Sequence, residues 1–409
     1  MKIRNCLLLA IVVFYTGCSK GPALNDAREV SISSIAPSSG PAGTTVIIKG
    51  ANFGINRSDN IVRFNKDSAT VLTSANDSLV VVAPAKGSTG PVSVTVAGSV
   101  ATGPVFTYTI DSVDVFVAAP AFGVVYWKNG QEIFLASTQS NFGGAYGIAI
   151  SDTDVYVGGY TKFFNTFPSS QGAYWKNGKK TLLSSPNSEG EIRSLVISGG
   201  DLYAGGSEDY RPAYWKNGIK HSLPIFFGGS AGLNALAIDG NDVYAAGFEP
   251  GPGNELNLVY WKNGVETVLG KNGLEGGASS IAVKGNDVYV CGSDSGYAVY
   301  WKNGVRTVLE KIPPAGAPIT TSAIAIAANS IYVVGSSHGE AVYWKDGTRV
   351  TLPRRGNSGA ASAITFYQSD IYIGGQDGSS PVYWKNGVEV SLCCGLDGIV
   401  SAIAVVKKR

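Results

Sequence analysis

The amino-acid sequence predicts an all-β protein in which a β-sandwich precedes a seven-bladed β-propeller closed by its C-terminal strand. The string YWKNG, once YWKDG, recurs seven times, and each copy holds one of the seven tryptophans: Trp127, Trp175, Trp215, Trp261, Trp301, Trp344 and Trp384. Successive tryptophans are 48, 40, 46, 40, 43 and 40 residues apart, a period typical of propeller blades. Before the repeats, residues 31–110 show short alternating strands split by turn residues, the pattern of a sandwich.

Residues 1–17 have the features of an export signal. Lys2 and Arg4 form a charged start, CLLLAIVVFY an apolar stretch too short to span a bilayer, and TGC a small-residue cleavage site. The segment resembles a bacterial lipoprotein signal, which implies lipidation of Cys18 and anchoring to the outer membrane or cell surface. Ordinary secretion and an uncleaved anchor are the alternatives. Residues 18–30 are polar, contain Gly and Pro, and are expected to be a flexible tether.

The predicted sandwich, residues 31–110, begins with the stretch IAPSSGPAGTTVIIKGANFG. Pro37, Gly40, Gly43, Gly50 and Phe53 in this stretch, with the later VVVAP and FTY, resemble an IPT/TIG immunoglobulin-like domain. The resemblance covers the whole domain. It implies a spacer or an interaction module without catalytic residues.

Residues 111–409 are predicted to form the propeller, because each repeat contains four strand-like segments. The region starts with the second type of strand, DVFVAA from Asp114, and ends with the first type, SAIAVV from Ser401. We therefore expect the last strand to complete the first blade, which would leave no open edge. The hairpin at Gly147 resembles the bacterial seven-bladed propeller repeat, and the double glycines are similar to those of kelch repeats.

The recurrent string predicts a hairpin, because Asn-Gly favours the type I′ turn. Across that turn each tryptophan should face a charged residue, such as Lys180 opposite Trp175, while the tyrosine beside it should pack on a leucine eight residues after the tryptophan. We interpret the string mainly as a structural unit. Seven equivalent aromatic sugar sites are the alternative. The seven lysines of the strings are expected to form a solvated rim, and the recurrent aspartates before the second strands to form turns.

Function is expected where the blades differ, on the face that holds the connections from second to third strand and from fourth strand to the next blade. Aromatic and basic residues gather in these connections, a composition that suits a carbohydrate or peptide surface. The candidate ligand-binding residues are Tyr160, Phe163, Phe164, Phe167, Tyr210, Arg211, Phe226, Phe227 and Tyr297. For the phenylalanines, packing within their own loop or against the junction with the first domain is an equally good interpretation.

The composition argues against other classes of function. Without Lys2 and Arg4 the chain has 30 basic and 30 acidic residues, so nothing favours nucleic acid. Two histidines give no metal constellation, and GGSAG at Gly228 joins two strands, where a nucleophile elbow needs a strand-to-helix turn. We expect Cys291 to be a buried apolar residue, and Cys393 and Cys394 to be reduced or joined in a strained disulfide.

The sequence thus predicts a monomeric, non-catalytic envelope protein with no cofactor and no metal, which binds a glycan. The alternatives are a protein-protein scaffold of the envelope and a propeller hydrolase or lyase.

Overall fold

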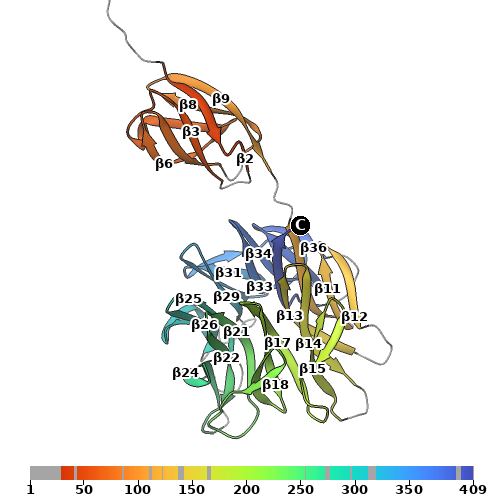
Figure 1. Ribbon diagram of the computed structural model, residues 1–409. Helices are drawn as coiled ribbons and strands as arrows, with labels where there is room; N and C mark the ends of the chain where they lie inside the picture. Colours follow the sequence, from red (N-terminus) through yellow and green to blue (C-terminus); the bar gives the residue numbers. More distant parts are fainter. Residues whose placement is uncertain are drawn as a thin grey trace, which may run out of the picture. The chain divides into compact units, whose positions relative to one another are not determined.

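A computed structural model describes residues 29–40, 44–84, 87–109, 113–121, 123–136, 142–163, 167–253, 255–271, 277–294, 297–311, 319–392 and 398–408. The chain forms two compact units, residues 1–111 and 112–409 (Figure 1). The predicted signal, Cys18 and most of the tether lie outside the described residues, as do Phe164, Cys393 and Cys394. In the described ranges no helix is long and apolar enough to cross a membrane.

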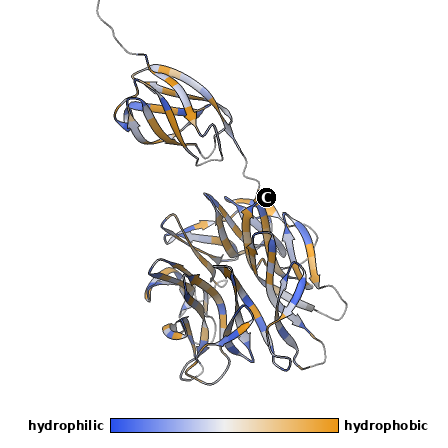
Figure 2. Cartoon of the chain, viewed as in Figure 1, coloured by the Kyte–Doolittle hydropathy of each residue, from blue (hydrophilic) through white to orange (hydrophobic). Residues whose placement is uncertain are grey.

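The N-terminal unit is a sandwich of two sheets, with strand orders β1-β3-β7-β6 and β2-β9-β8-β4-β5. Its elements are β1 (Ser31–Ala36), β2 (Ser39–Gly40), β3 (Thr45–Ala51), the short 3-10 helix η1 (Arg57–Asp59), β4 (Asn60–Phe64), β5 (Asp67–Ser68), β6 (Thr70–Ala75), β7 (Ser78–Val82), β8 (Gly90–Val96) and β9 (Ser99–Tyr108). Hydrophobic and hydrophilic residues alternate along these strands (Figure 2). The alternation turns one face of each sheet to a core centred on Phe64 and Phe106, whose rings meet edge to face at 5.0 Å.

The C-terminal unit consists of seven four-stranded antiparallel sheets, as predicted. In sequence order the blades are β10 (Val113–Ala121), β11 (Gly123–Lys128), β12 (Gln131–Ala136) and β37 (Ala402–Lys407); β13 (Phe142–Ser151), β14 (Asp154–Lys162), β15 (Ser170–Lys176) and β16 (Lys179–Leu182); β17 (Gly190–Ser198), β18 (Asp201–Glu208), β19 (Arg211–Lys216) and β20 (Ile219–Ser222); β21 (Gly232–Asp239), β22 (Asp242–Pro250), β23 (Leu256–Lys262) and β24 (Val265–Lys271); β25 (Ala278–Lys284), β26 (Asp287–Asp294), β27 (Tyr297–Lys302) and β28 (Val305–Lys311); β29 (Thr320–Ala327), β30 (Ser330–Ser337), β31 (Glu340–Lys345) and β32 (Thr348–Thr351); and β33 (Gly359–Tyr367), β34 (Asp370–Asp377), β35 (Ser380–Lys385) and β36 (Val388–Ser391).

The ring closes through β37, which confirms the predicted closure. This strand pairs with β10 from Val113↔Lys407 to Ala118↔Ala402, so the first blade contains strands from both ends of the repeat region. The first strands of the blades contact each other around the ring, and β37 lies between β33 and β13. Closure covers the edge of β10, which would otherwise be open to pairing with another chain.

Tryptophan is the packing residue between blades. All seven tryptophans are at most 2% exposed, so the interpretation as surface sugar sites is wrong. Each packs on the preceding blade: Trp261 lies in one cluster with Tyr214 and Leu223, and Trp127 of the first blade lies with residues of the seventh. The predicted pairing across the turn is confirmed, for example Trp175↔Lys180. The string is therefore a structural unit.

The lysine and asparagine of the string bind the aspartate that precedes the second strand. In six blades Asn Nδ2 donates to Asp Oδ1 at 2.7–2.8 Å, and Lys Nζ pairs with Asp Oδ2 at 2.7–3.0 Å. Each lysine also lies 5.1–5.5 Å from the centroid of a Phe or Tyr ring on the second strand. The lysine side chains remain 42–49% exposed, so they form the predicted solvated rim, and in six blades each also joins the asparagine and aspartate in one network.

The first strands share a further repeated feature, which is a β-bulge near the start of each strand. Register shifts occur at equivalent positions of β13, β17, β21, β25, β29 and β33. In the first blade the equivalent residue precedes β37, and its N–H donates to Ala118 O at 2.8 Å. The seven residues at these positions are Tyr146, Arg193, Asn234, Ser279, Ser322, Ser362 and Ser401.

We predict that removing residues 399–409 destabilises the propeller, because β10 loses its partner and the core loses Val400 and Ile403. Burial of these two side chains alone predicts a loss of at least about 4 kcal/mol in the free energy of unfolding. Urea denaturation followed by tryptophan fluorescence measures it. Removal of Lys408 and Arg409 alone is the matched control. An unchanged transition in the longer truncation would show that closure by β37 is dispensable.

Candidate functional site

The candidate site is a cleft between the second and third blades, on the face opposite the Asn-Gly turns. The cavity has a volume of about 310 Å³ and is lined by Tyr146, Tyr160, Lys162, Ser169, Ser170, Glu189, Gly190, Glu191, Ser207 and Tyr210. These residues come from the first half of first strands, the ends of second strands, the start of β15, and the connections that join second to third strands and one blade to the next. The cleft thus lies on the face where the blades differ.

Tyrosine rings form one side of the cleft. Tyr146, at the bulge of β13, stacks on Tyr160 of β14 with ring centroids 5.8 Å apart and planes 22° apart. The guanidinium carbon of Arg193 lies 5.8 Å from the centroid of Tyr146. Burial, with Tyr160 and Glu191 nearby, raises the pKa of Tyr146 to about 12. Tyr146 therefore remains a neutral phenol that can donate a hydrogen bond at physiological pH.

Glu189 supplies a charged hydrogen-bond acceptor to the cleft. Its Oε1 accepts from Ser169 N at 3.2 Å and Ser169 Oγ at 2.7 Å, and its Oε2 accepts from Tyr210 Oη at 2.8 Å. These hydrogen bonds, from Ser169 first and then Tyr210, lower the pKa of Glu189, so it stays ionised at neutral pH. The neighbouring Glu191 pairs with Arg193 at 2.6 Å.

Tyr210 occupies a backbone conformation that bulky residues rarely adopt. Asp209 and Tyr210 form a two-residue turn with φ of 49° and 58°. The same short connection occurs in the sixth and seventh blades, Ser337 pairing with Glu340 and Asp377 with Ser380. In these three blades the connection from the second to the third strand is thus as short as the Asn-Gly turn. The turn projects Tyr210, 61% exposed, over the cleft, where its hydroxyl binds Glu189. Strained residues of this kind cluster at functional sites.

Buried acids at the ends of the second strands anchor the connections between blades. Glu208 Oε1 accepts from Ser185 N at 2.5 Å, Glu249 Oε2 from Phe226 N at 2.9 Å, and Asp377 from the backbone N–H groups of Arg355 and Gly356 at 2.6 and 2.8 Å. Each acid binds the connection that leaves the preceding blade. The sequence analysis missed one signal of these acids. An Asp or Glu follows seven residues after the aspartate that begins the second strand, as in Asp201 and Glu208.

The acid at the end of the second strand also faces a side chain of the fourth strand of its own blade, and this residue differs among blades. Glu208 pairs with Lys220, and Asp294 pairs with Arg306 at 2.5 Å. Burial opposes ionisation of Glu208, but Lys220 and the Ser185 N–H lower its pKa overall. In the fourth blade the partner of Glu249 is Glu266, whose carboxyl oxygens are buried without a hydrogen-bond partner among the described residues. Burial first, and Glu249 second, raise the pKa of Glu266 to about 7.

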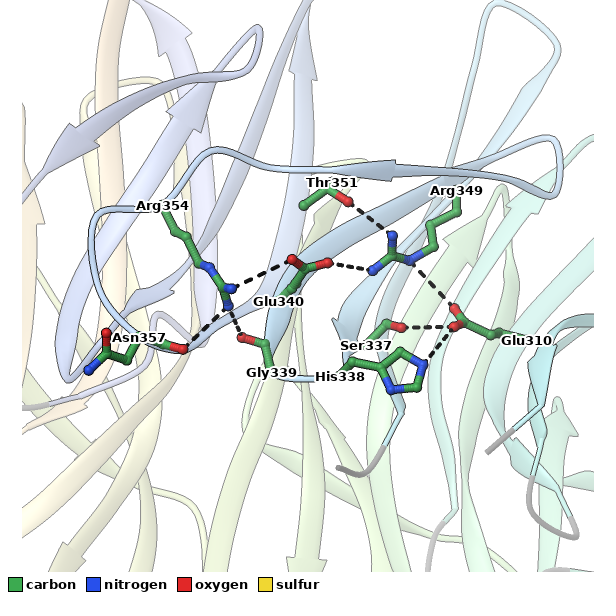
Figure 3. Close-up of polar contacts among 9 residues, drawn as sticks. All are labelled: Glu310, Ser337, His338, Gly339, Glu340, Arg349, Thr351, Arg354 and Asn357. Atoms are coloured by element: carbon green, nitrogen blue, oxygen red, sulfur yellow. Dashed lines mark hydrogen bonds and ion pairs between the residues drawn. The ribbon is translucent and has the colours of Figure 1, made fainter. Parts of the chain in front are cut away.

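The charged residues of the sixth blade bind one another. Arg349 Nη2 donates to Glu340 at 2.8 Å, and its Nε lies 3.7 Å from Glu310 (Figure 3). His338 lies 3.4 Å from Glu310, and Arg354 lies 3.6 Å from Glu340 and donates to Gly339 O at 2.7 Å. This network ties the connections of the sixth blade to the end of β28. It does not leave a patch of unbalanced charge for a ligand.

The structure brings only two of the predicted ligand residues together, Tyr160 and Tyr210. Phe167 is 75% exposed and Phe163 lies in the same connection, but neither lines the cleft. Arg211, Phe226, Phe227 and Tyr297 lie elsewhere: Phe226 and Phe227 are in the connection held by Glu249, and the ring of Tyr297 lies 5.1 Å from Arg306. Sequence reasoning missed Lys162, Glu189 and Glu191. In the described ranges no group of three or more His, Cys, Asp or Glu could hold a metal.

Comparison with known proteins identifies the first unit. A family model for the IPT/TIG domain matches residues 31–108. These residues form an IPT/TIG domain. The IPT/TIG assignment confirms the predicted resemblance and leaves the propeller, which holds the cleft, outside the matched region. No curated protein matches the sequence.

The solved structures that resemble the chain are distant in sequence. An auxiliary nutrient binding protein from Bacteroides thetaiotaomicron is 13% identical, with 85% of this chain and 95% of that chain covered and a TM-score of 0.33. A puromycin hydrolase mutant complexed with PGG is 14% identical, with 70% and 53% covered and a TM-score of 0.46. A chain of a nidogen/laminin complex is 10% identical, with 72% and 98% covered and a TM-score of 0.40.

We predict that Glu266→Gln stabilises the protein above neutral pH. The fold raises the pKa of Glu266 from 4.5 to about 7, so between these values the folded state binds more protons than the unfolded state. Stability is therefore lost as the pH rises through this window, and glutamine should recover about 1–3 kcal/mol at pH 8 and little at pH 4. Urea denaturation at both pH values measures the difference. Lys220→Met, which leaves Glu208 unpaired, should instead destabilise at pH 8. A wild-type stability that does not fall between pH 4.5 and 7 relative to Glu266→Gln would contradict the assignment.

Proposed function

We propose that the propeller is a non-catalytic binding module and that its ligand is a glycan held in the cleft between the second and third blades. The observation that supports this proposal is the convergence of Tyr146, Tyr160 and Tyr210 with Lys162, Glu189 and Glu191 in one cavity. Aromatic rings stack on the apolar face of a sugar, and fixed polar groups read its hydroxyls.

The charges of the cleft favour an uncharged ligand. Glu191 and Arg193 neutralise each other at 2.6 Å. Lys162 and ionised Glu189 carry opposite charges on the same cavity. Neither positive nor negative charge dominates the cleft. It therefore offers hydrogen-bond donors and acceptors without a strong electrostatic field, and this suits the hydroxyl groups of a ligand better than a carboxylate or phosphate.

The two carboxyl groups of the cleft support binding over hydrolysis. Glycoside hydrolysis needs one carboxyl group that stays protonated to act as general acid. Glu189 has a lowered pKa and Glu191 is paired with Arg193, so neither group is prepared for that role. A propeller hydrolase would require a different pair of groups.

We predict that Tyr160→Ala weakens glycan binding by at least about 10-fold, the factor that follows from losing about 1.4 kcal/mol of stacking. A glycan array identifies ligands of the purified protein, and affinity gels with the positive polysaccharides measure the loss. Phe226→Ala is the matched control, because Phe226 is 74% exposed on the same face and lies outside the cleft.

Equal losses in both variants would move the ligand away from the cleft. Binding of no glycan by the folded wild type would contradict the proposal and favour the scaffold alternative, for which crosslinking in the native envelope would reveal a protein partner.

We further propose that the protein is exported and held on the outer membrane or cell surface by a lipid on Cys18, with the IPT/TIG domain as a spacer. The support is the charged start, the short apolar stretch and the TGC sequence of residues 1–18. We predict that Cys18→Ala moves the protein from the detergent phase to the aqueous phase in a detergent partition, and abolishes labelling by a fatty-acid probe. Cys6→Ala is the control. Retention of label in Cys18→Ala would rule out this anchor.

A further inference from the structure

The central channel of the propeller has a polar mouth on the same face as the cleft. A cavity of about 320 Å³ lies there, lined by Tyr146, Arg193, Asn234, Ser279, Ser322 and Ser401, together with Thr321. The first six are residues of the bulge positions, contributed by six different blades. A bulge turns a side chain away from the regular alternation of a strand, and here it places one residue from each of these six blades at the channel mouth.

The mouth and the cleft share a wall. Tyr146 lines both cavities, and Arg193, which lines the mouth, contacts the Tyr146 ring and pairs with Glu191 of the cleft. A ligand that stacks in the cleft therefore has its next unit beside the channel mouth. The two cavities together hold about twice the volume of either one.

The mouth offers both hydrogen-bond donors and hydrogen-bond acceptors. Arg193 uses Nε for Glu191 and Nη1 for Asn234 Oδ1 at 3.2 Å, which leaves Nη2 to donate. Ser401 commits its single proton to Ala145 O at 2.7 Å or Ala118 O at 3.0 Å, so its oxygen can only accept. Ser279 and Ser322 also line the mouth, and a serine hydroxyl can both donate and accept a hydrogen bond.

The chemistry of these groups selects an uncharged partner. Arg193 is the one charged residue that lines the mouth among the described residues, and Glu191 neutralises it. A carboxylate in this position would lose water without meeting a net positive charge. A hydroxyl or amide group both donates and accepts, and so can bind Arg193 and the serines at once.

We propose that the channel mouth is a second subsite, which holds an uncharged, hydroxyl- or amide-bearing unit of an oligosaccharide whose neighbouring unit stacks in the cleft. This inference rests on the proposed glycan-binding function. It adds that the ligand occupies at least two consecutive subsites, that longer chains bind more tightly than short ones, and that neutral chains bind more tightly than acidic chains.

The test blocks the mouth without altering the cleft. Ser322→Tyr places a phenol in the mouth, and tyrosine fits this backbone position because Tyr146 occupies the equivalent bulge in the second blade. Ser322→Ala, which removes one hydroxyl and adds no bulk, is the matched control. Tyr160→Ala disables the cleft. Thermal unfolding of each variant verifies that it is folded.

Isothermal titration compares dimers and hexamers of neutral cello- and chito-oligosaccharides with oligogalacturonides of equal length. For the wild type we expect the neutral hexamer to bind at least about 10-fold more tightly than the dimer, and the acidic chains to bind more weakly. Ser322→Tyr should erase the gain from dimer to hexamer, Ser322→Ala should keep most of it, and Tyr160→Ala should weaken dimer and hexamer alike.

Each other outcome has a definite meaning. Wild-type length dependence in folded Ser322→Tyr would overturn the second subsite while leaving glycan binding in the cleft intact. Loss of binding in Ser322→Tyr with none in Tyr160→Ala would place the ligand in the mouth and overturn the cleft. Preference for oligogalacturonides would overturn the uncharged class. A folded wild type that binds none of these chains would overturn both the proposed function for these sugars and the subsite that depends on it.

Discussion

The propeller depends on the packing of each blade's tryptophan against the tyrosine and leucine of the blade before it. A single blade cannot bury this ring, because its apolar partners belong to a neighbour. Burial of seven such side chains, each at most 2% exposed, requires every blade to have a neighbour on both sides. Closure by β37 meets that requirement for Trp127, which packs on the seventh blade. The stability of the propeller is thus a property of the closed ring, because no single blade can bury its own tryptophan.

This dependence explains why the most conspicuous residues of the sequence are not available to a ligand. The tryptophan side chains are buried between blades, and in most blades the lysine and the asparagine bind the aspartate. The positions that differ between blades are free to specialise. They are the bulge residues, the ends of the second strands and the connections that follow, and the cleft and the channel mouth are both built from them.

Much of the fold could be predicted, because period, Asn-Gly turns and alternation are local signals. The seven blades, the closing strand and the Trp175↔Lys180 pairing followed from them, whereas the IPT/TIG domain came from its resemblance to that family. The site was predicted only in part. Tyr160 and Tyr210 were found by their place in variable connections. Glu189 and Glu191 were missed, because they line the cleft only through contacts between two blades, such as that of Glu189 with Ser169.

The buried acids at the ends of the second strands have a consequence for how such a face can change. Glu208, Glu249 and Asp377 bind backbone N–H groups, which every residue except proline possesses. The residues held in this way are as different as Ser185, Phe226 and Arg355. A connection can therefore exchange its side chains while its attachment to the scaffold persists. Specificity on this face can diverge by substitution without a compensating change in the framework.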